Sequence, residues 1–479
     1  MKQSTLCVLI VFAGILSSAS ALRSIREFGA IPNNKSDEAS WINSRAIAQA
    51  LVSANSSDDD RVAHIPEGDT YYMFYFEAAN LTNLTFRIDG TLFINDNRTA
   101  WPAQVPHRMS AFYFQDSSHI TIEGKGVVEG QGYWWWWNTI LTAKDHRASL
   151  LVMEACTDVV IRGVEFRNSP EYHIFLHDVR DVVIRDLSIM VDTIGQKKLL
   201  SDHGLLDSFG IPTFPLNTDG IDPAGENILI ENVTIQCYDD AVAVKPMTKK
   251  GKNAQCSRNM TIRNATVIYG VGMTIGSVPP NDNFNCVEDI LFEDILFRYP
   301  IKAIYVKPNP GDHGYGIINN ITYRNIVGHY SLWYPIWIGT QQQQQPGDDK
   351  GTGCSFFYPI IDKCPTQPRV PISNLTLENV TFTGGLTLPG VIICNETAPC
   401  TGFKFINVKN TGVFLVQRSY VVKNIYGISV GSSPNPHFAT NTSDSEAFEY
   451  VAENPTFDYV SNDGGSIDIA DADDEFDSN

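Results

Sequence analysis

Apolar and polar residues alternate in short runs along most of the chain, and Asn, Asp or Gly flanks each run. Alternation with a period of two predicts β-strands, and the flanking residues are those that tolerate the turns between strands. The runs that share this pattern are 83–90, 158–163, 181–186, 227–232, 259–264, 289–294, 320–325 and 374–379. From 227 to 320 they begin 32, 30 and 31 residues apart, which indicates an internal repeat.

The repeat also predicts the architecture. Long amphipathic helices do not separate the runs, which argues against alternating βαβ units and a doubly wound sheet. One unit of this kind cannot bury its own apolar face, whereas stacked units share a continuous core. We therefore predict an all-β fold in which residues 22–430 form one parallel β-helix. The alternative is a β-propeller, which is disfavoured because its blades are longer and carry a different repeat signature.

The two ends of the chain differ from this repeat. Residues 1–21 contain an apolar run over 6–16 followed by Ala19-Ser20-Ala21, the pattern of a cleaved signal peptide. The run is too short to span a bilayer, so we expect a secreted, extracellular protein with no membrane segment. No Lys or Arg follows Lys423, and twelve acidic residues lie between 444 and 477. Residues 431–479 are therefore predicted to be an acidic, disordered tail.

The charge distribution bears on the partners. The tail carries −12 of the net charge of −19, so that the charge of the remaining chain is only moderately negative. A basic face of the kind that binds nucleic acid is absent from the sequence, so we expect no nucleic-acid partner. We expect a monomer.

The cysteines suggest disulfides and not a metal site, because no pair has zinc-ligand spacing with a second pair or with histidines. Eight cysteines remain after the signal peptide, an even number that suits an oxidising compartment. Two pairs are close in sequence, Cys354 with Cys364 and Cys394 with Cys400. A third pair, Cys256 with Cys286, would occupy the same point on successive coils. Thirteen Asn-x-Ser/Thr sequons allow N-glycosylation, although some of these asparagines are expected to be structural.

Three carboxylates carry the candidate chemistry: Asp219 and the adjacent pair Asp239-Asp240. Like charges a few Å apart raise one pKa and leave another low, which supplies the proton donor and the base that glycoside hydrolysis requires. The alternative is that they are ordinary turn residues. Because Asp219 and Asp239 are 20 residues apart, about one coil, stacking would gather all three on one face. Two further segments, 270–277 and 303–307, would join that face.

Several ordered motifs resemble those of family 28 glycoside hydrolases, the polygalacturonase and rhamnogalacturonase family. They are Phe28-Gly29-Ala30, Ile65-Pro66-Glu67-Gly68, Gly124-Lys125-Gly126, Gly130-Gln131-Gly132 with Trp134 to Trp137, Asn168-Ser169-Pro170, Asn217-Thr218-Asp219 and Asp239-Asp240. The resemblance runs from about residue 25 to 410. It implies a single-stranded right-handed parallel β-helix and an inverting hydrolysis of pectin-type polysaccharide that uses neither metal nor cofactor.

The resemblance also implies a role for each site residue. Asp239 would be the general acid that protonates the leaving oxygen, while Asp219 and Asp240 would hold and deprotonate the attacking water. Asn217 would orient the base, and Lys307 would bind a hydroxyl or carboxylate of the sugar. Inversion needs carboxyl groups roughly 6.5–9.5 Å apart, a spacing that we expect adjacent coils to provide.

The chain departs from the polygalacturonase pattern at two positions. Val271 stands where that pattern has a histidine, and Tyr305 stands where it has an arginine that clamps a uronate carboxylate. The acid/base set is intact, so the departures change sugar recognition, as in the rhamnogalacturonase branch, and argue against plain polygalacturonan as substrate. Tyr305 either stacks on a sugar face as a substrate-binding residue or is a buried strand tyrosine.

Three other functions remain possible. The chain could hydrolyse rhamnogalacturonan or another non-galacturonan polymer, or it could be a catalytically weak carbohydrate-binding β-helix protein. A β-helical polysaccharide lyase is disfavoured, because such an enzyme uses calcium and a basic proton acceptor, whereas this face offers a proton donor beside a base.

Other residues were weighed against ordinary structural roles. His173 and His177 have no partner carboxylate at a telling spacing, so we expect them to be structural. Trp134 to Trp137 could line a sugar groove or fill the core. We interpret 341–345, a run of five glutamines, as a loop insertion. Lys245 is either a second cationic contact or a solvated lysine, and the sequence favours the solvated one.

Overall fold

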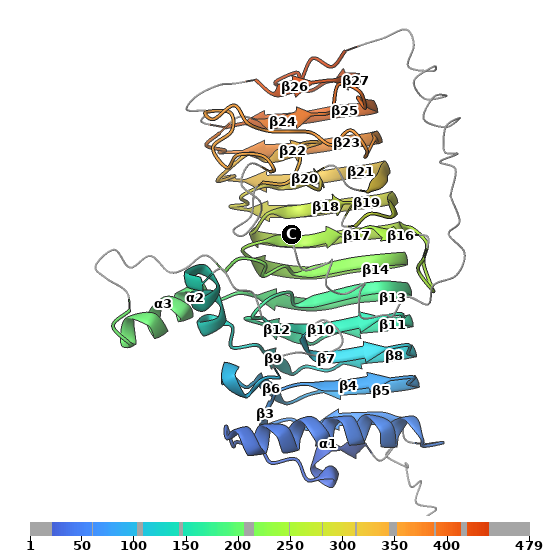
Figure 1. Cartoon of the computed structure of the whole chain (residues 1–479), viewed down its shortest axis with the longest axis vertical. Coiled ribbons are helices and arrows are strands. Elements are labelled where there is room, and N and C mark those ends of the chain that lie inside the picture. Colours follow the sequence, from blue (N-terminus) through green and yellow to red (C-terminus); the bar gives the residue numbers. More distant parts are fainter. Residues whose placement is uncertain are drawn as a thin grey trace, which may run out of the picture.

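The chain is a stack of parallel coils (Figure 1). The computed structural model describes residues 22–439, except for 60, 103–108, 143–146, 206–214, 249, 280, 312–313, 344–351, 388 and 413–418. Its 27 strands form one continuous sheet, in which strands of successive coils pair in parallel, and the short strand β16 pairs antiparallel with β19. The predicted all-β parallel β-helix is confirmed, and the propeller alternative is wrong. The predicted signal peptide and most of the predicted tail lie outside the described residues.

Three columns of strands run along the stack. The first column carries the repeat and contains β1 (Arg23–Ser24), β2 (Val62–Ile65), β5 (Thr82–Ile88), β8 (Ser118–Glu123), β11 (Thr157–Arg162), β13 (Ile174–Met190), β14 (Ile221–Cys237), β17 (Ser257–Tyr269), β19 (Phe284–Arg298), β21 (Tyr315–His329), β23 (Ile372–Thr383), β25 (Cys400–Thr411) and β27 (Ile425–Val430). The second column contains β4 (Phe76–Ala79), β7 (Ser110–Gln115), β10 (Ser149–Glu154), the first residues of β13 and β14, β15 (Asp240–Val244), β18 (Gly272–Val278), β20 (Ile304–Pro308), β22 (Ile336–Ile338), β24 (Gly390–Ile393) and β26 (Val421–Lys423). The third contains β3 (Thr70–Met73), β6 (Thr91–Ile94), β9 (Val127–Glu129) and β12 (Glu165–Arg167) and continues in the last residues of β13 and β14.

Each predicted run of the repeat lies on the first-column strand of a different coil. Ile228, Met260, Ile290 and Ile321 are paired in register from β14 to β21, and each is at most 2% exposed. Identical positions of successive coils therefore fill one continuous core, as the repeat predicted.

The Asn or Asp that opens each repeat turns the chain at a corner. These residues have left-handed backbones with φ between 53° and 58° in the coils from Asp158 to Asn374, a conformation that Asn and Asp tolerate best among residues with a side chain. Their side chains also join the coils: Asn227 donates to Asp181 at 2.9 Å, and Asn259 donates to Asn227 at 2.7 Å. The corners thus form a polar ladder along the outside of the stack.

Helices cover one end and one side of the stack (Figure 1). The helix α1 (Asp37–Asn55) closes the N-terminal end and buries Ile47, Ala50 and Leu51 against the first coils; a covered edge cannot pair with another chain. The helices α2 (Tyr133–Thr142) and α3 (Thr193–Asp202) project from the side, and the short 3-10 helices η1 (Ile25–Phe28) and η2 (Arg98–Ala100) and the strand β16 (Met247–Thr248) lie in connections. None of the described helices has the length and apolar character needed to cross a membrane.

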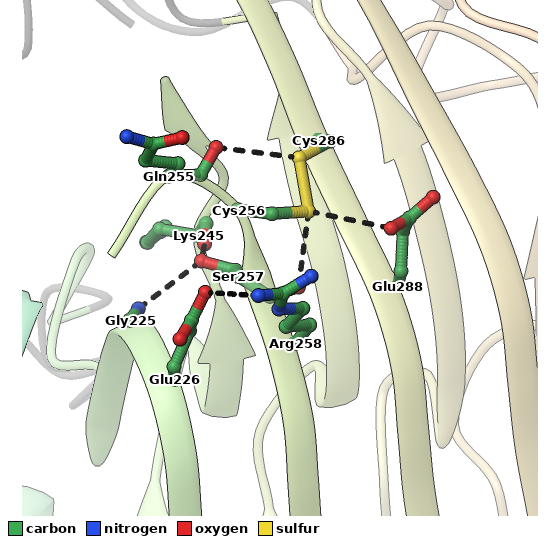
Figure 2. Close-up of a disulfide and its surroundings, with 9 residues drawn as sticks. All are labelled: Gly225, Glu226, Lys245, Gln255, Cys256, Ser257, Arg258, Cys286 and Glu288. Atoms are coloured by element: carbon green, nitrogen blue, oxygen red, sulfur yellow. Dashed lines mark hydrogen bonds and ion pairs between the residues drawn. A yellow bond between two sulfur atoms is a disulfide. The ribbon is translucent and has the colours of Figure 1, made fainter. Parts of the chain in front are cut away.

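All three predicted disulfides are present. Cys256 and Cys286 join successive coils with their Cα atoms 5.1 Å apart, and Figure 2 shows this bridge beside the Glu226–Arg258 ion pair. The spacing follows from the distance between paired strands. The other two bridges are Cys354–Cys364 and Cys394–Cys400, which close short loops. Cys156 and Cys237 are free and buried.

We expect the corner ladder to contribute measurably to stability. Replacing Asn227 with Ala removes a side-chain hydrogen bond on each side and places Ala in the left-handed region, so the free energy of unfolding should fall by about 2 kcal/mol. The control is Asn227→Gly, which loses the same hydrogen bonds but accepts the backbone conformation and should lose less. Denaturant unfolding followed by circular dichroism measures both, and equal losses would contradict the conformational part of this account.

Candidate active site

The second strand column presents a row of outward side chains where β15, β18 and β20 are adjacent. Met273 and Ile304 are paired in register and point into the core. Because side chains alternate along a strand, their neighbours Thr274 and Tyr305 point outward, and Lys307 does so two residues further on. These outward positions lie next to the predicted aspartates.

The outward row is nevertheless buried. Thr274, Tyr305 and Lys307 are 0%, 2% and 7% exposed, although side chains outside a coil usually face water. Tyr305 packs in an apolar cluster with residues that follow β22, among them Cys354 and Tyr358. Segments from later coils therefore cover the outside of this column and enclose the polar side chains.

The structure brings the three predicted aspartates together. Asp219 directly precedes the second-column part of β14, and Gly220 donates its N–H to the carbonyl of Asp240 at 2.9 Å. One carboxylate oxygen of each of Asp219, Asp239 and Asp240 lies within 4.8 Å of the others. Asp219 and Asp240 are 3% and 1% exposed, whereas Asp239 is partly exposed. The geometry that stacking predicted is therefore present.

Backbone amides hold the carboxylate of Asp239. The N–H of Asn217 donates to its Oδ2 atom at 3.0 Å, and the N–H of Asp240 donates to Oδ1 at 3.0 Å. Arg147 in turn donates to the side chain of Asn217 at 2.9 Å. Burial and the adjacent charge of Asp240 raise the pKa of Asp239. Asp239 is thus an oriented, partly accessible carboxyl group that retains a proton more readily than a free aspartate.

Asp240 is in the opposite electrostatic environment. Lys307 donates to its Oδ2 atom at 2.8 Å, and the hydroxyl of Thr274 donates to Oδ1 at 2.6 Å. Burial alone would raise the pKa of Asp240, but Lys307, Lys245 and these hydrogen bonds lower it below the ordinary value. Asp240 is therefore the member of the set that stays ionised.

Asp219 faces a fourth carboxylate that sequence reasoning did not identify. The Nζ atom of Lys245 lies 3.8 Å from Asp219 and 3.3 Å from Asp222. Burial, followed by the charges of Asp222 and Asp239, raises the pKa of Asp219 well above its ordinary value, and burial raises that of Asp222 to about 6. The buried Oδ1 atom of Asp219 has no hydrogen-bond partner among the described residues, so it can accept one from a water or a substrate hydroxyl.

The arrangement supplies both an acid and a base. Two lysines pair with three of the four carboxyl groups, namely Asp219, Asp222 and Asp240, so the set cannot be fully ionised without a surplus of buried negative charge. The raised pKa values of Asp219 and Asp239 favour a bound proton on these two groups. Such a pairing of a proton donor with an ionised carboxylate suits general acid/base chemistry.

The nearest carboxylate oxygens of Asp219, Asp239 and Asp240 lie within 4.8 Å of one another, because Asp219 and Asp240 occupy adjacent coils about 4.8 Å apart. The expected spacing of about 6.5–9.5 Å refers to whole carboxyl groups and not to their nearest oxygens, so it stays a prediction. Inversion likewise rests on the family resemblance.

The same three carboxylates form a group whose oxygen atoms could ligate a cation. Lys307 and Lys245 already place positive charge beside Asp240 and Asp219. The charge of the group can therefore be offset by the chain's own residues.

The structure favours the buried alternative for Tyr305. The hydroxyl of Tyr305 and the ammonium of Lys302 both donate to the Oε1 atom of Gln343, at 2.7 and 2.6 Å, and the Nζ atom of Lys302 lies 3.7 Å from the centroid of the Tyr305 ring. With 2% exposure, the ring offers almost no surface on which a sugar could stack. At the position of the family histidine, the N–H of Val271 donates to the carbonyl of Asp239 at 2.8 Å.

Two other interpretations need correction. The glutamine run is not a simple surface insertion, because Gln341, Gln342 and Gln343 are buried and Gln343 contacts the outward row, while residues 344 and 345 lie outside the described ranges. Lys245 is not a solvated lysine, since its side chain is 16% exposed and pairs with two aspartates. Lys245 falls on the same register row as Lys307, with Gly276 between them, so the repeat itself carried this signal.

The remaining predicted residues have structural roles. His173 is fully buried, its Nδ1 atom lies 2.8 Å from the carbonyl of Asp219, and its Nε2 atom accepts the N–H of Ser169. Burial lowers the pKa of His173 to about 4, so it stays neutral and braces the turn before β14. Trp135 and Trp136 belong to the core, which favours the core-filling alternative for that part of the tryptophan run.

The sequence and the fold were compared with known proteins. Residues 63–433 match the sequence profile described as glycosyl hydrolases family 28. A protein from Aspergillus flavus described as "Probable rhamnogalacturonase E" is 23% identical over 434 residues, which are 87% of this chain and 79% of that protein. A "Polygalacturonase" from Persea americana is 23% identical over 397 residues, 81% of this chain and 74% of the relative.

A similar fold is seen in the crystal structure of endo-xylogalacturonan hydrolase from Aspergillus tubingensis. Its TM-score is 0.61 with 19% sequence identity, and the match covers 83% of this chain and 96% of that one. The shared architecture is the right-handed parallel β-helix. The chain therefore belongs to glycosyl hydrolase family 28 and is a glycosidase that hydrolyses O-glycosyl bonds.

Proposed function

We propose that this glycosidase is an exported, monomeric hydrolase of pectin-type polysaccharide that works by inverting acid/base catalysis without a metal or cofactor. One observation carries the proposal: the enclosed set of Asp219, Asp239 and Asp240, in which the pKa of Asp240 is lowered while those of its two neighbours are raised. The names of the relatives, a rhamnogalacturonase and polygalacturonases, support a pectin-type substrate.

Asp239 is the proposed general acid. It is the most accessible of the three carboxyl groups, and its raised pKa favours a bound proton that can pass to the leaving glycosidic oxygen. The two amides that hold its carboxylate orient it towards the substrate.

Asp240 and Asp219 would act on the attacking water. Asp240 is kept ionised by Lys307 and can take the proton of the water, while the unpaired Oδ1 atom of Asp219 can hold that water by a hydrogen bond. Asp219 and Asp240 each lie two residues before the paired residues Ile221 and Val242 of adjacent coils, so one water can reach both.

We propose a rhamnogalacturonan-type polymer as the substrate, in preference to plain polygalacturonan. Tyr305 replaces the arginine that would clamp a uronate carboxylate, and its hydroxyl is already bound to Gln343. Lys307 is the proposed sugar-binding cation, since its flexible side chain can donate to a hydroxyl or carboxylate while it neutralises Asp240.

We expect Asp239→Asn to reduce hydrolysis by at least about 10³-fold, because the variant can no longer donate the proton. Release of reducing ends from homogalacturonan, rhamnogalacturonan and neutral glycans in the presence of EDTA measures this. The matched control is Asp181→Asn, a corner aspartate on the outside of the stack that accepts the amide of Asn227 at 2.9 Å. Equal inertness of wild type and Asp239→Asn on every polymer would refute the hydrolase, and an ultraviolet-absorbing unsaturated product would indicate a lyase.

Removal of the Lys307 charge should alter the pH profile. The pKa of Asp240 is depressed in part by Lys307, so the base is ionised at pH values above that low pKa. In Lys307→Met the pKa should rise, and the acid limb of kcat/KM should move to higher pH by about one unit or more. Lys307→Arg and the exposed Lys404→Met should leave the limb in place. If the acid limb of kcat/KM does not move in Lys307→Met, the role of this lysine is limited to substrate binding.

The anomeric form of the first product tests the stereochemical course. Proton NMR during the first turnovers should show the anomer opposite in configuration to the cleaved bond, because water attacks from the face opposite the leaving group. Retention would contradict the proposed inversion, and it would require one aspartate to act as a nucleophile.

A further inference from the structure

Four tyrosines stack at one corner of four successive coils. Ring centroids are 5.3 Å apart between Tyr238 and Tyr269, 6.0 Å between Tyr269 and Tyr299, and 5.5 Å between Tyr299 and Tyr330, with interplanar angles of 18°, 30° and 17°. We call these four residues the tyrosine ladder. Each lies just before the second-column part of its coil, where β15, β18, β20 and β22 follow.

The backbone at this corner is unfavourable for tyrosine. Tyr269, Tyr299 and Tyr330 have φ values of 62°, 56° and 57°, in the left-handed region, where a bulky side chain is an outlier. The other outer corners of the same coils use Asn or Asp, which offset the conformation with short polar side chains. Folding alone would therefore favour Asn at these three positions.

The ladder is also exposed. Tyr299 and Tyr330 are 43% and 57% accessible, so they bury little surface in return for the strained backbone. A strained backbone that is not compensated by the burial of its side chains indicates a functional constraint.

The stacking determines which part of each ring is available. Each inner ring lies between its neighbours, and on the coil after Tyr330 the corner is Gly384, where a Cβ atom would come within 2.6 Å of the Tyr330 ring. The ring faces of Tyr269, Tyr299 and Tyr330 are therefore covered, and the ring edges with their hydroxyls remain. The hydroxyls of Tyr299 and Tyr330 have no hydrogen-bond partner in the described part of the chain, whereas that of Tyr238 lies 2.9 Å from the hydroxyl of Thr193.

The ladder begins at the acid site and continues along the axis of the stack. Tyr238 is adjacent to Asp239, and two residues after Tyr269 the N–H of Val271 bonds the carbonyl of Asp239. Tyr299 and Tyr330 extend the row by two further coils towards the C-terminal end. A linear polymer with its scissile bond at Asp239 and its chain along the stack would pass beside this row.

We propose that the tyrosine ladder is a binding track for the polysaccharide chain, in which the phenol hydroxyls of successive coils hydrogen-bond hydroxyl or carboxylate groups of successive sugars. The inference rests on the proposed function for the nature of the ligand. Phenol hydroxyls both donate and accept, so they suit sugars of either kind. The spacing between the hydroxyls of successive coils is about the length of one sugar residue. The track should therefore bind an extended chain better than a short oligomer.

The strained backbone offers a selective test. In Tyr299→Asn combined with Tyr330→Asn, Asn relieves the strain, so the melting temperature should stay the same or rise while the track is lost. The double change is made in Asp239→Asn, which should bind without cleaving, and affinity for polygalacturonate and for rhamnogalacturonan is measured by titration calorimetry. We expect the polymer that the parent binds to be bound about tenfold more weakly.

Three further variants make the result specific. Tyr299→Phe with Tyr330→Phe keeps the stacked rings and should lose affinity as well, because the hydroxyls are gone. Tyr315→Asn changes a tyrosine that is 41% exposed but outside the ladder, and it should bind like the parent. With Asp239 intact, the Asn pair should raise KM for polymer more than it raises KM for short oligosaccharides.

Unchanged affinity in the Asn pair would overturn the track, as would a melting temperature that falls along with affinity, since the ladder would then be structural. A wild-type dimer in sedimentation experiments that the Asn pair dissolves would also overturn it, in favour of a second copy as partner. A failure of the proposed hydrolase is distinguishable, because it appears as equal activity of wild type and Asp239→Asn, whatever the ladder variants do.

Discussion

The close pairing of two coils at Gly220 is the constraint on which the candidate site depends. Its N–H bonds the carbonyl of Asp240 at 2.9 Å, and a Cβ atom at this position would come within 2.4 Å of the carbonyl of Ala241. Only glycine allows the coils to approach this closely. Asp219 precedes Gly220 in the chain, so the close approach of the backbones at Gly220 also brings the carboxyl group of Asp219 near that of Asp240. The rest of the stack serves to hold that register.

The enclosed charge follows from the same register. Lys245 and Lys307 occupy one row on coils two apart, and each faces an aspartate of the set. Carboxyl groups that are buried together cannot all be ionised, so proximity itself separates their pKa values. The coil geometry therefore produces an acid and a base from chemically identical residues, and burial by later segments strengthens the difference because it excludes water.

Much of the fold was predictable from local patterns. The alternation of apolar residues and the Asn or Asp at each corner are properties of single coils. They recur because every coil has to bury the same apolar face against its neighbours. The Cys256–Cys286 bridge was predictable for the same reason, since equal positions in successive repeats become neighbours. The grouping of the three aspartates followed from their separation of about one coil.

The residues that surround the aspartates were less predictable. Tyr305 and the first glutamines of the run appear in the sequence as ordinary outward or loop positions, and they are buried because segments after β22 fold back over the second column. These contacts join residues whose spacing in the sequence does not follow the repeat, so the period of the repeat does not predict them. The sequence by itself determined the solenoid, its register and the grouping of the three aspartates, because these depend on contacts between equal positions of neighbouring coils. Only the tertiary structure decided which outward side chains are enclosed, how closely the carboxyl groups approach and which of them the lysines neutralise, because those properties depend on loops that pack across several coils.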